Sequence, residues 1–344
     1  NVVVGSGKVN KLDVQLTSES KTLDEVVVTE HKVPLVEQDN TTQGVTLTKE
    51  QIEKSPFRNI TAIVSNSGGV STGNTGSVSI RGSRPSATTY IVDGVKVSGA
   101  YLPPSELEQL QVITGGLEAQ YGDVTGGVVV ASTRGPSQNF NLYIDGETSK
   151  YLDPYGRSEV NVSTSGPIWK KDNKSIIGFR LGGRYIGSFD DSPSFQSRRY
   201  MKESEVARLE ANPLRKVGSA YFPEGEFNTT SITEWSKTSK NNQSRNYDLN
   251  GKLDFRLPSN IDIQIGGGYT DSKDRFSPSN AWSLVNYNNN PYNYFNRYRG
   301  NFRFRHRLGN QNEVDKGFIQ NVSYTIIGGY EKEFSHSQDY RHKD

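Results

Sequence analysis

The strongest constraint on the fold of this chain is a two-residue repeat of apolar side chains, which begins after Gly135-Pro136 and runs through the second half. Within 247–257, for example, Tyr, Leu and Phe alternate with Asp, Asn, Lys and Arg. Such alternation predicts β-strands with one apolar face and one charged face. We count about seven strands of this kind, the clearest at 140–147, 177–185, 247–257, 261–265, 302–305 and 318–326.

The connections between these strands alternate in length. We expect short turns near Pro167–Lys174, Pro258–Asn260 and Gly309–Lys316, a long loop at about Ser188–Ser244 and a medium one at about Asp271–Asn293. Short turns on one side and long loops on the other are typical of outer-membrane β-barrels. A soluble β-sandwich with one wet face would show the same alternation of side chains, but the difference in loop length counts against it.

Composition excludes several other classes. Hydrophobic residues make up 32% of the chain, and the mean hydropathy is −0.69. No apolar run approaches the roughly 18 residues of a membrane-spanning helix. The chain has no cysteine, which rules out disulfides and thiolate metal sites. The net charge of +2 comes from interspersed charges of both signs, so we expect no nucleic-acid partner.

The first 44 residues fall into two parts. Residues 1–20 have partial alternation and are interpreted as the end of a small β-domain, and no signal peptide precedes them, so we expect one to have been removed. Residues 21–44 hold the β-branched stretch Leu23–Glu30 followed by a polar linker.

Residues 45–135 have a mixed α/β pattern. A helix N-cap is expected at Thr48. A second short helix is expected at Phe57–Val64, and short strands at Val78–Arg81, Tyr90–Asp93, Gln109–Thr114 and Val128–Thr133. Glycine clusters at 68–76, 115–116 and 126–127 are flanked by these strands, which indicates tight turns and close backbone approaches.

Four motifs in this region resemble, in order and spacing, the plug signatures of TonB-dependent receptors. They are Ile80-Arg81-Gly82, Ile91-Val92-Asp93-Gly94, Tyr121-Gly122 and Gly126-Gly127-Val128-Val129. The stretch Leu23–Glu30 resembles the TonB box of that family in its Bacteroidetes form, and the preceding residues resemble the end of a carboxypeptidase-regulatory-like domain. The resemblance implies a plug at 45–135 and barrel strands at 136–344.

The family has a 22-stranded barrel in the bacterial outer membrane, plugged from the periplasm. About seven antiparallel strands cannot close that circumference, and an open edge in lipid would leave backbone groups unpaired at a cost of several kcal/mol each. The expected fold is therefore a partial membrane β-barrel preceded by a mixed α/β plug, and we expect further sequence beyond Asp344 in the natural protein.

Two features depart from the family pattern. Thr114 stands where many members carry an arginine, so a plug-to-barrel ion-pair network would rest on Arg81, which could equally be a plain surface arginine. The segment Leu117–Gln120 differs from that of the starch-utilisation (SusC-like) transporters, so a SusD-type surface lipoprotein is a possible partner that the sequence does not imply.

The resemblance implies energised transport. An extended peptide can add as a strand to a partner's sheet edge, and the three valines at 26–28 have the required β-propensity. The residues expected to bind the periplasmic domain of TonB are Leu23, Asp24, Glu25, Val26, Val27, Val28, Thr29 and Glu30. An ordinary edge strand of the N-terminal domain is the alternative.

A ligand would first meet the apices of the plug. The loops 83–88 and 98–104 are expected at that end, which makes Arg84, Tyr101 and Leu102 the candidate contacts, although turn chemistry also explains their surroundings. The ligand, a small molecule, glycan or peptide, is not identified by the sequence, because one scaffold carries many cargoes. Outer-membrane lipid is the remaining expected partner.

An enzyme is not expected. The segment Gly69–Gly73 matches G-x-S-x-G, but that motif needs a strand-turn-helix context with a histidine and an acid nearby. No metal or cofactor motif is present in the sequence. A plugged barrel that serves as a structural or receptor subunit of an envelope assembly or export complex is the alternative to the transporter.

Overall fold

The computed structural model describes residues 42–57, 60–73, 77–98, 104–122, 124–135, 137–171, 174–191, 194–258, 260–308 and 322–341. These residues form two compact units, which divide between Arg134 and Gly135. The segment 1–41, with the expected TonB box, lies outside the described residues. Among the described residues, no helix has the length and apolarity needed to cross a membrane.

The first unit is built on a five-stranded sheet with the order β1-β6-β7-β4-β5, which is antiparallel except where β4 pairs with β7. A separate hairpin, β2-β3, accompanies it. The elements are β1 (Gln43–Thr48), α1 (Lys49–Lys54), α2 (Ile60–Ser65), β2 (Val70–Thr72), β3 (Val78–Ile80), η1 (Pro85–Ala87), β4 (Thr89–Val92), β5 (Val95–Val97), η2 (Pro104–Glu106), β6 (Leu107–Gly115), η3 (Ala119–Tyr121) and β7 (Val128–Thr133).

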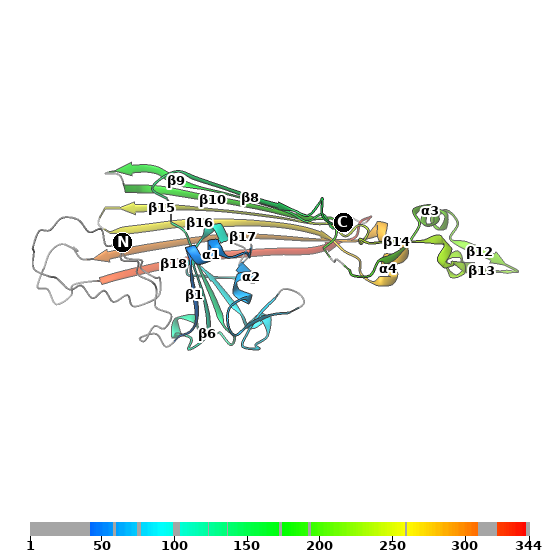
Figure 1. Ribbon diagram of the computed structural model, residues 1–344, viewed down its shortest axis with the longest axis horizontal. Coiled ribbons are helices and arrows are strands. Elements are labelled where there is room, and N and C mark those ends of the chain that lie inside the picture. Colours follow the sequence, from blue (N-terminus) through cyan, green and yellow to red (C-terminus); the bar gives the residue numbers. More distant parts are fainter. Residues whose placement is uncertain are drawn as a thin grey trace, which may run out of the picture. The chain divides into compact units, whose positions relative to one another are not determined.

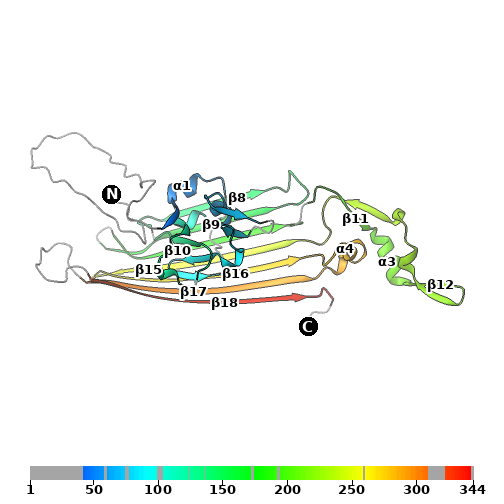
Figure 2. The ribbon, with the colours of Figure 1, turned by 90° about the horizontal axis from the view of Figure 1, so that it is seen from below.

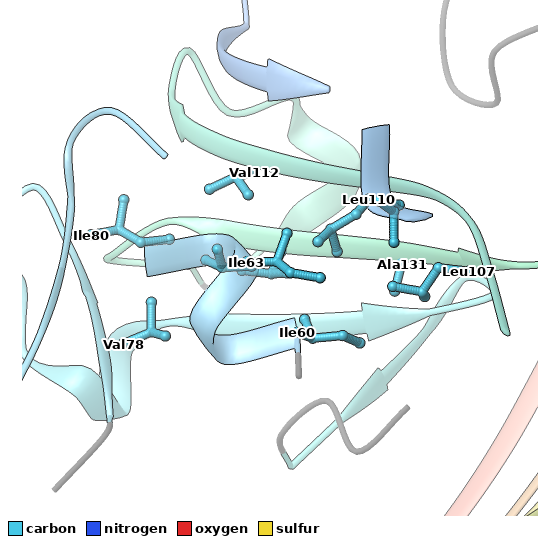
Figure 3. Close-up of a cluster of buried hydrophobic side chains, with 11 residues drawn as sticks. Ile60, Ile63, Val78, Ile80, Leu107, Leu110, Val112 and Ala131 are labelled. Atoms are coloured by element: carbon cyan, nitrogen blue, oxygen red, sulfur yellow. The ribbon is translucent and has the colours of Figure 1, made fainter. Parts of the chain in front are cut away.

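The core of this unit lies between its two α-helices and the strands. Figure 3 shows Ile60 and Ile63 of α2 directed toward side chains of the sheet, among them Leu110 and Ala131. All four are at least 97% buried. Full burial of one such aliphatic side chain contributes about 1.5–3 kcal/mol, so this cluster stabilises the unit even though the chain as a whole is polar.

The expected elements of the first unit are largely present. The strand at Val128–Thr133 has the expected bounds, and Gln51 accepts a hydrogen bond from the Thr48 amide at 3.0 Å, which caps α1. The expected helix start at Phe57 is wrong, because α2 begins at Ile60 and Phe57 is 38% exposed. The apolar pattern predicted too early a start for this helix, because Phe57 is apolar but does not join the core.

The second unit is a seven-stranded antiparallel sheet with the order β18-β17-β16-β15-β10-β9-β8. Its neighbours in space are also neighbours along the chain, apart from the short elements between β10 and β15, and Figure 2 shows the long strands side by side. The strands are β8 (Asn141–Thr148), β9 (Ser158–Lys171), β10 (Lys174–Ser188), β15 (Ser244–Leu257), β16 (Ile261–Arg275), β17 (Tyr292–Leu308) and β18 (Val322–Gln338).

The two faces of this sheet have the polarity of a membrane protein. Leu181 and Leu249, on one face, are 54% and 55% exposed. On the other face Asp248 and Arg297 are only 3% and 4% exposed. A protein surrounded by water hides apolar side chains and exposes charges, whereas an outer-membrane strand directs apolar side chains to lipid and polar ones inward.

The connections between described strands alternate in length as the sequence predicts, and the expected turn at Gly309–Lys316 lies outside the described residues. Residues 149–157, 189–243 and 276–291 join strands at one end, and residues 172–173 and 258–260 join them at the other. Two expected bounds are wrong: Pro167 lies inside β9 rather than in a turn, and β16 continues to Arg275, past the expected loop start at Asp271. β9 itself has fewer large apolar residues than its neighbours, and its alternation was not recognised.

The long connection folds into further small elements, which Figure 1 shows beyond one end of the sheet. They are β11 (Arg198–Met201), α3 (Glu203–Ala211), β12 (Leu214–Val217), β13 (Ala220–Pro223), η4 (Glu224–Phe227), η5 (Thr230–Ile232) and β14 (Thr233–Ser236). The next long connection contributes α4 (Asn280–Val285) and η6 (Tyr287–Asn289).

Candidate functional site

The motif Ile80-Arg81-Gly82 forms a tight turn. Arg81 and Gly82 both have positive φ angles, +51° and +73°, and the Ser83 amide donates to the Ile80 carbonyl at 3.0 Å. Two consecutive positive φ angles are typical of a type I′ turn, and they favour glycine at the second position. Ile80 is buried in the core at the start of this turn.

The turn directs Arg81 back across the sheet. Its guanidinium donates to the Gln43 side chain at the start of β1. A Cβ atom on Gly115 would lie 2.6 Å from Arg81 Nη1, so the guanidinium packs directly over that glycine in β6. Thr114 Oγ1 also donates to the Gln43 carbonyl, at 3.1 Å. Arg81 and Thr114 therefore both hold the beginning of β1 to the plug.

The Asp93-Gly94 pair forms the turn of the β4–β5 hairpin. Both residues have positive φ angles, +50° and +88°. The amide of Asp93 donates to the Ala131 carbonyl at 3.0 Å, which ties the turn to β7. A type I′ turn with Asp-Gly at its centre is the commonest sequence signal for a hairpin. These motif residues therefore serve the fold of the plug.

Two further motif glycines allow close backbone approach. A Cβ on Gly126 would lie 2.7 Å from the Ala87 carbonyl oxygen, and one on Gly127 would lie 2.5 Å from the Ile80 side chain. No larger residue fits there without displacement of its neighbours. Tyr121 ends the short helix η3 and Gly122 follows it.

The loop before β4 borders a pocket of about 660 Å³ within the plug. It is lined by η1, the start of β4 and the end of β5. The lining residues include Ser86, Thr89, Ser98, Thr125 and Lys96. The volume falls within the range of small-ligand sites, and the lining suits a polar ligand with oxygen acceptors.

The expected contact residues relate to this pocket in different ways. Arg84 is exposed and immediately precedes η1, but it does not line the pocket. Tyr101 and Leu102 lie outside the described residues, as does Leu23–Glu30. The sequence did not predict Lys96 as part of the pocket lining, because a single lysine in a three-residue strand after Asp-Gly is typical of an ordinary hairpin.

Two long connections join in a second cluster at one end of the sheet. The rings of Tyr200 and Tyr287 meet edge to face with centroids 5.5 Å apart, and Tyr287 donates to the Met201 carbonyl at 3.1 Å. Lys240 Nζ lies 4.8 Å from the centre of the Tyr287 ring and 2.6 Å from Glu234 Oε1. Burial is the largest single influence and lowers the pKa of Lys240, but the hydrogen bond to Glu234 and the charges of Tyr287 and Glu234 together raise it above its ordinary value.

The motif G-x-S-x-G does not have the context of a catalytic serine. Ser71 lies within β2, which pairs with β3, rather than at a turn from a strand into a helix. The nucleophile of a hydrolase needs that sharp turn to expose its hydroxyl.

A small α/β domain followed by a sheet with an apolar exposed face defines the class of outer-membrane proteins in which a plug precedes barrel strands. A family model described as the TonB-dependent receptor plug domain matches residues 37–129. The first unit therefore carries the plug domain of TonB-dependent receptors, and the chain is an outer-membrane protein rather than an enzyme.

Individual relatives agree with this assignment. The vitamin B12 transporter BtuB of Vibrio vulnificus is 28% identical over 199 residues, which is 52% of this chain and 32% of that protein. The TonB-dependent transporter Oar of Myxococcus xanthus is 30% identical over 148 residues, 38% of this chain and 14% of that protein. The chain thus spans about a third or less of these curated relatives.

A solved structure supports the fold. The siderophore receptor PirA from Acinetobacter baumannii superposes with a TM-score of 0.52 at 18% sequence identity, over 86% of this chain and 45% of that chain. At this identity the likeness shows the plugged-barrel architecture alone.

Proposed function

We propose that this chain belongs to a transporter that binds a ligand at its extracellular side and imports it when TonB displaces the plug. The observation that carries the proposal is the position of β1 at the edge of the plug sheet, where β6 is its one partner among the described strands. Residues 1–41 precede this strand directly, and the expected TonB box, Leu23–Glu30, is among them.

An edge strand is the part of a sheet that a pulling force removes most easily. Six residue pairs join β1 to β6, and they end at Gln43, the point nearest to the proposed box. A pull toward the N-terminus would load Gln43 first, together with its contacts to Arg81 and Thr114. Once those contacts break, the ladder can open pair by pair, while the rest of the sheet stays hydrogen-bonded.

The ligand would bind near the pocket beside η1. The start of β4 and the end of β5 lie at the same end of the plug sheet, because β4 and β5 form an antiparallel hairpin. The start of β7 lies there too, since β7 runs parallel to β4. This end combines Lys96 with several hydroxyl groups, which favours an anionic or oxygen-rich cargo. Vitamin B12 and siderophores, which relatives are named for, differ widely in structure, so we propose only that class.

The proposal is tested by binding of the purified full chain to the periplasmic domain of TonB. Deletion of residues 23–30 is compared with deletion of an equal length of the polar linker that follows. Binding that is lost only with the first deletion supports energised uptake. Binding that survives it, or is absent from the intact chain, counts against the proposal.

A structural or receptor subunit of an envelope complex is the second candidate. It is favoured by the β12–β13 hairpin, which carries Leu214 and Tyr221 at 59% and 64% exposure beyond the end of the sheet. Exposed apolar side chains on a loop fit a protein partner, such as a surface lipoprotein. In that case deletion of residues 23–30 would leave the biological function intact, whereas deletion of the hairpin would abolish it.

A further inference from the structure

On the apolar face of the seven-stranded sheet, the strand register places two basic side chains next to two rings. Arg245 of β15 lies opposite Lys273 of β16, Lys273 lies opposite Tyr294 of β17, and Tyr294 lies opposite His336 of β18. We call these four residues the basic row. It crosses four neighbouring strands near the ends that carry the long connections.

The basic row is on the apolar face, not on the charged one. Side chains two residues apart point the same way in a strand, and Arg245 is two residues from Tyr247, which is 40% exposed. Lys273 Nζ lies 4.1 Å from the centre of the Tyr292 ring and 5.0 Å from that of Tyr294. The rings of Tyr294 and His336 stack with centroids 4.8 Å apart.

The register also gives the level of the row in a membrane. Twelve residue steps separate Leu257, at the short-turn end of the same face, from Arg245. At about 3.4 Å per step and a strand tilt of about 40°, the two lie roughly 30 Å apart along the membrane normal. The apolar band of an outer-membrane barrel is about 25 Å tall and its long loops are extracellular. The row therefore lies just outside that band, at the headgroups of the outer leaflet.

Of the two basic side chains in the row, Arg245 has a carboxylate partner in the part of the chain that the structure describes. Among the described residues, Lys273 has no carboxylate within ion-pair distance, and its amino group contacts aromatic rings instead. Asp271 lies 4.0 Å from Arg245, and its other oxygen accepts a hydrogen bond from Asn296 at 2.8 Å. The group is thus net positive, next to an apolar surface.

Arg275, which lies near the row, has a structural role and differs from Arg245 in its contacts. Arg275 Nε donates to the Asn290 carbonyl at 3.1 Å, and its Nη2 donates to the Asn288 carbonyl at 2.6 Å. Arg275 is 8% exposed and anchors the following connection. Arg245, at 50% side-chain exposure, makes no such backbone contacts in the part of the chain that the structure describes.

We propose that Arg245 and Lys273 bind the phosphate of an anionic lipid headgroup in the outer leaflet, with Tyr294 and His336 beside it. Basic residues at a membrane surface attract anionic headgroups, each with about a fivefold gain in affinity. Aromatic rings at the same level are amphipathic and suit the boundary between acyl chains and headgroups. The lipid would hold the extracellular ends of β15, β16 and β17 at a fixed depth.

The test uses the full chain in detergent micelles, with diphosphorylated lipid A as the probe and native mass spectrometry as the readout. The variant is Arg245→Gln with Lys273→Gln. The matched control is Lys170→Gln with Lys171→Gln, which removes two exposed lysines at the opposite end of β9. We expect the variant to lose affinity roughly 30-fold, and the control to keep it.

Further binding measurements distinguish a lipid site from a site for free anions and from a nonspecific effect of charge. Lys273→Arg should retain binding, since it keeps the charge. Lipid A without its phosphates should bind the unaltered chain as weakly as diphosphorylated lipid A binds the double variant. Equal competition by inorganic phosphate would show a site for free anions, and equal loss in the control would show a nonspecific charge effect. Either result overturns the proposal.

Discussion

The carboxylate of Asp93 accepts two hydrogen bonds from Thr133, one from the backbone amide at 2.9 Å and one from the hydroxyl at 2.6 Å. These bonds join the turn of the β4–β5 hairpin to the last residue of β7, 40 positions away in the sequence. Asp93 thus both permits the turn and fixes it against the sheet. A residue of a family motif here acts on the stability of the plug.

Removal of this carboxylate should loosen that end of the plug. Asp93→Ala loses both hydrogen bonds and places alanine at a φ of +50°, so we expect a loss of about 2–4 kcal/mol in the local free energy of opening. Asp93→Asn should lose less, because asparagine tolerates that φ and can still accept one bond. Hydrogen exchange of the amides in 89–97 of the full chain measures the effect. Unchanged exchange in Asp93→Ala would contradict it.

Gly127 and Gly73 should respond very differently to the same substitution. A methyl group on Gly127 would lie 2.5 Å from the Ile80 side chain and 2.7 Å from the Ile113 carbonyl, whereas one on Gly73 would meet nothing within 4 Å. We expect Gly127→Ala to destabilise the plug by about 1–3 kcal/mol and Gly73→Ala to have little effect. Urea unfolding of the full chain, followed by exchange of the core amides, compares them. Equal stabilities would refute the packing argument.

Sequence patterns predicted the local features of both units. Asp93-Gly94 indicated a turn and Gly126-Gly127 a close approach, because the backbone geometry depends mainly on those residues. The apolar alternation likewise predicted strands wherever one face carries large side chains. It was less informative for β9, where Val160 and Val162 alternate with small polar residues.

Contacts between residues far apart in the chain could not be predicted from the sequence. The hydrogen bond from Arg81 to Gln43 spans 38 positions and that from Tyr287 to Met201 spans 86. Nothing in local spacing connects such pairs, so the fastening of β1 and the joining of two long connections emerge only from the fold. The role of the loop 83–88 in ligand binding stays a prediction, and Lys96 joins the lining of the nearby pocket only through the register of β5 with β4.

The inner face of the sheet should depend on one ion pair. Arg184 contacts Asp248 Oδ2 through two nitrogens at 3.0 and 2.8 Å, and Thr270 donates to Asp248 Oδ1 at 2.8 Å. The side chains of Arg184 and Asp248 are 9% and 4% exposed. Loss of either partner leaves a buried charge, so we expect Arg184→Ala or Asp248→Ala to cost about 3–5 kcal/mol each.

The double variant distinguishes pairing from packing. Arg184→Ala with Asp248→Ala removes both charges, and it should cost clearly less than the sum of the single changes. Denaturant unfolding of the full chain in micelles measures the stability of each variant in this double-mutant cycle. Arg256→Ala, which removes an exposed charge on a neighbouring position, is the control. Additive effects would mean that the two side chains act independently.

The β12–β13 hairpin should loosen in acid. Glu224 accepts hydrogen bonds from Arg215 at 2.6 and 2.7 Å and from Arg208 at 3.0 Å. Arg215 first, and Arg208 second, hold the pKa of Glu224 below its ordinary value. Because the folded state then binds the proton more weakly than the unfolded one, the contacts stabilise the hairpin above the unfolded pKa of about 4.3 and this stability is lost as the pH falls through the folded pKa.

Hydrogen exchange of the amides in 214–227, expressed as protection relative to the free peptide rate, should therefore fall as the pH is lowered from about 5. Glu224→Gln should be less protected at neutral pH and should show no such fall. Glu226→Gln changes a neighbouring carboxyl on the same short helix, η4, and should keep the pH dependence of the unaltered chain. The pH dependence could instead disappear in Glu226→Gln or persist in Glu224→Gln. Either result would mean that another group controls the hairpin, because in our account only the carboxyl bound by Arg215 and Arg208 links protonation to hairpin stability.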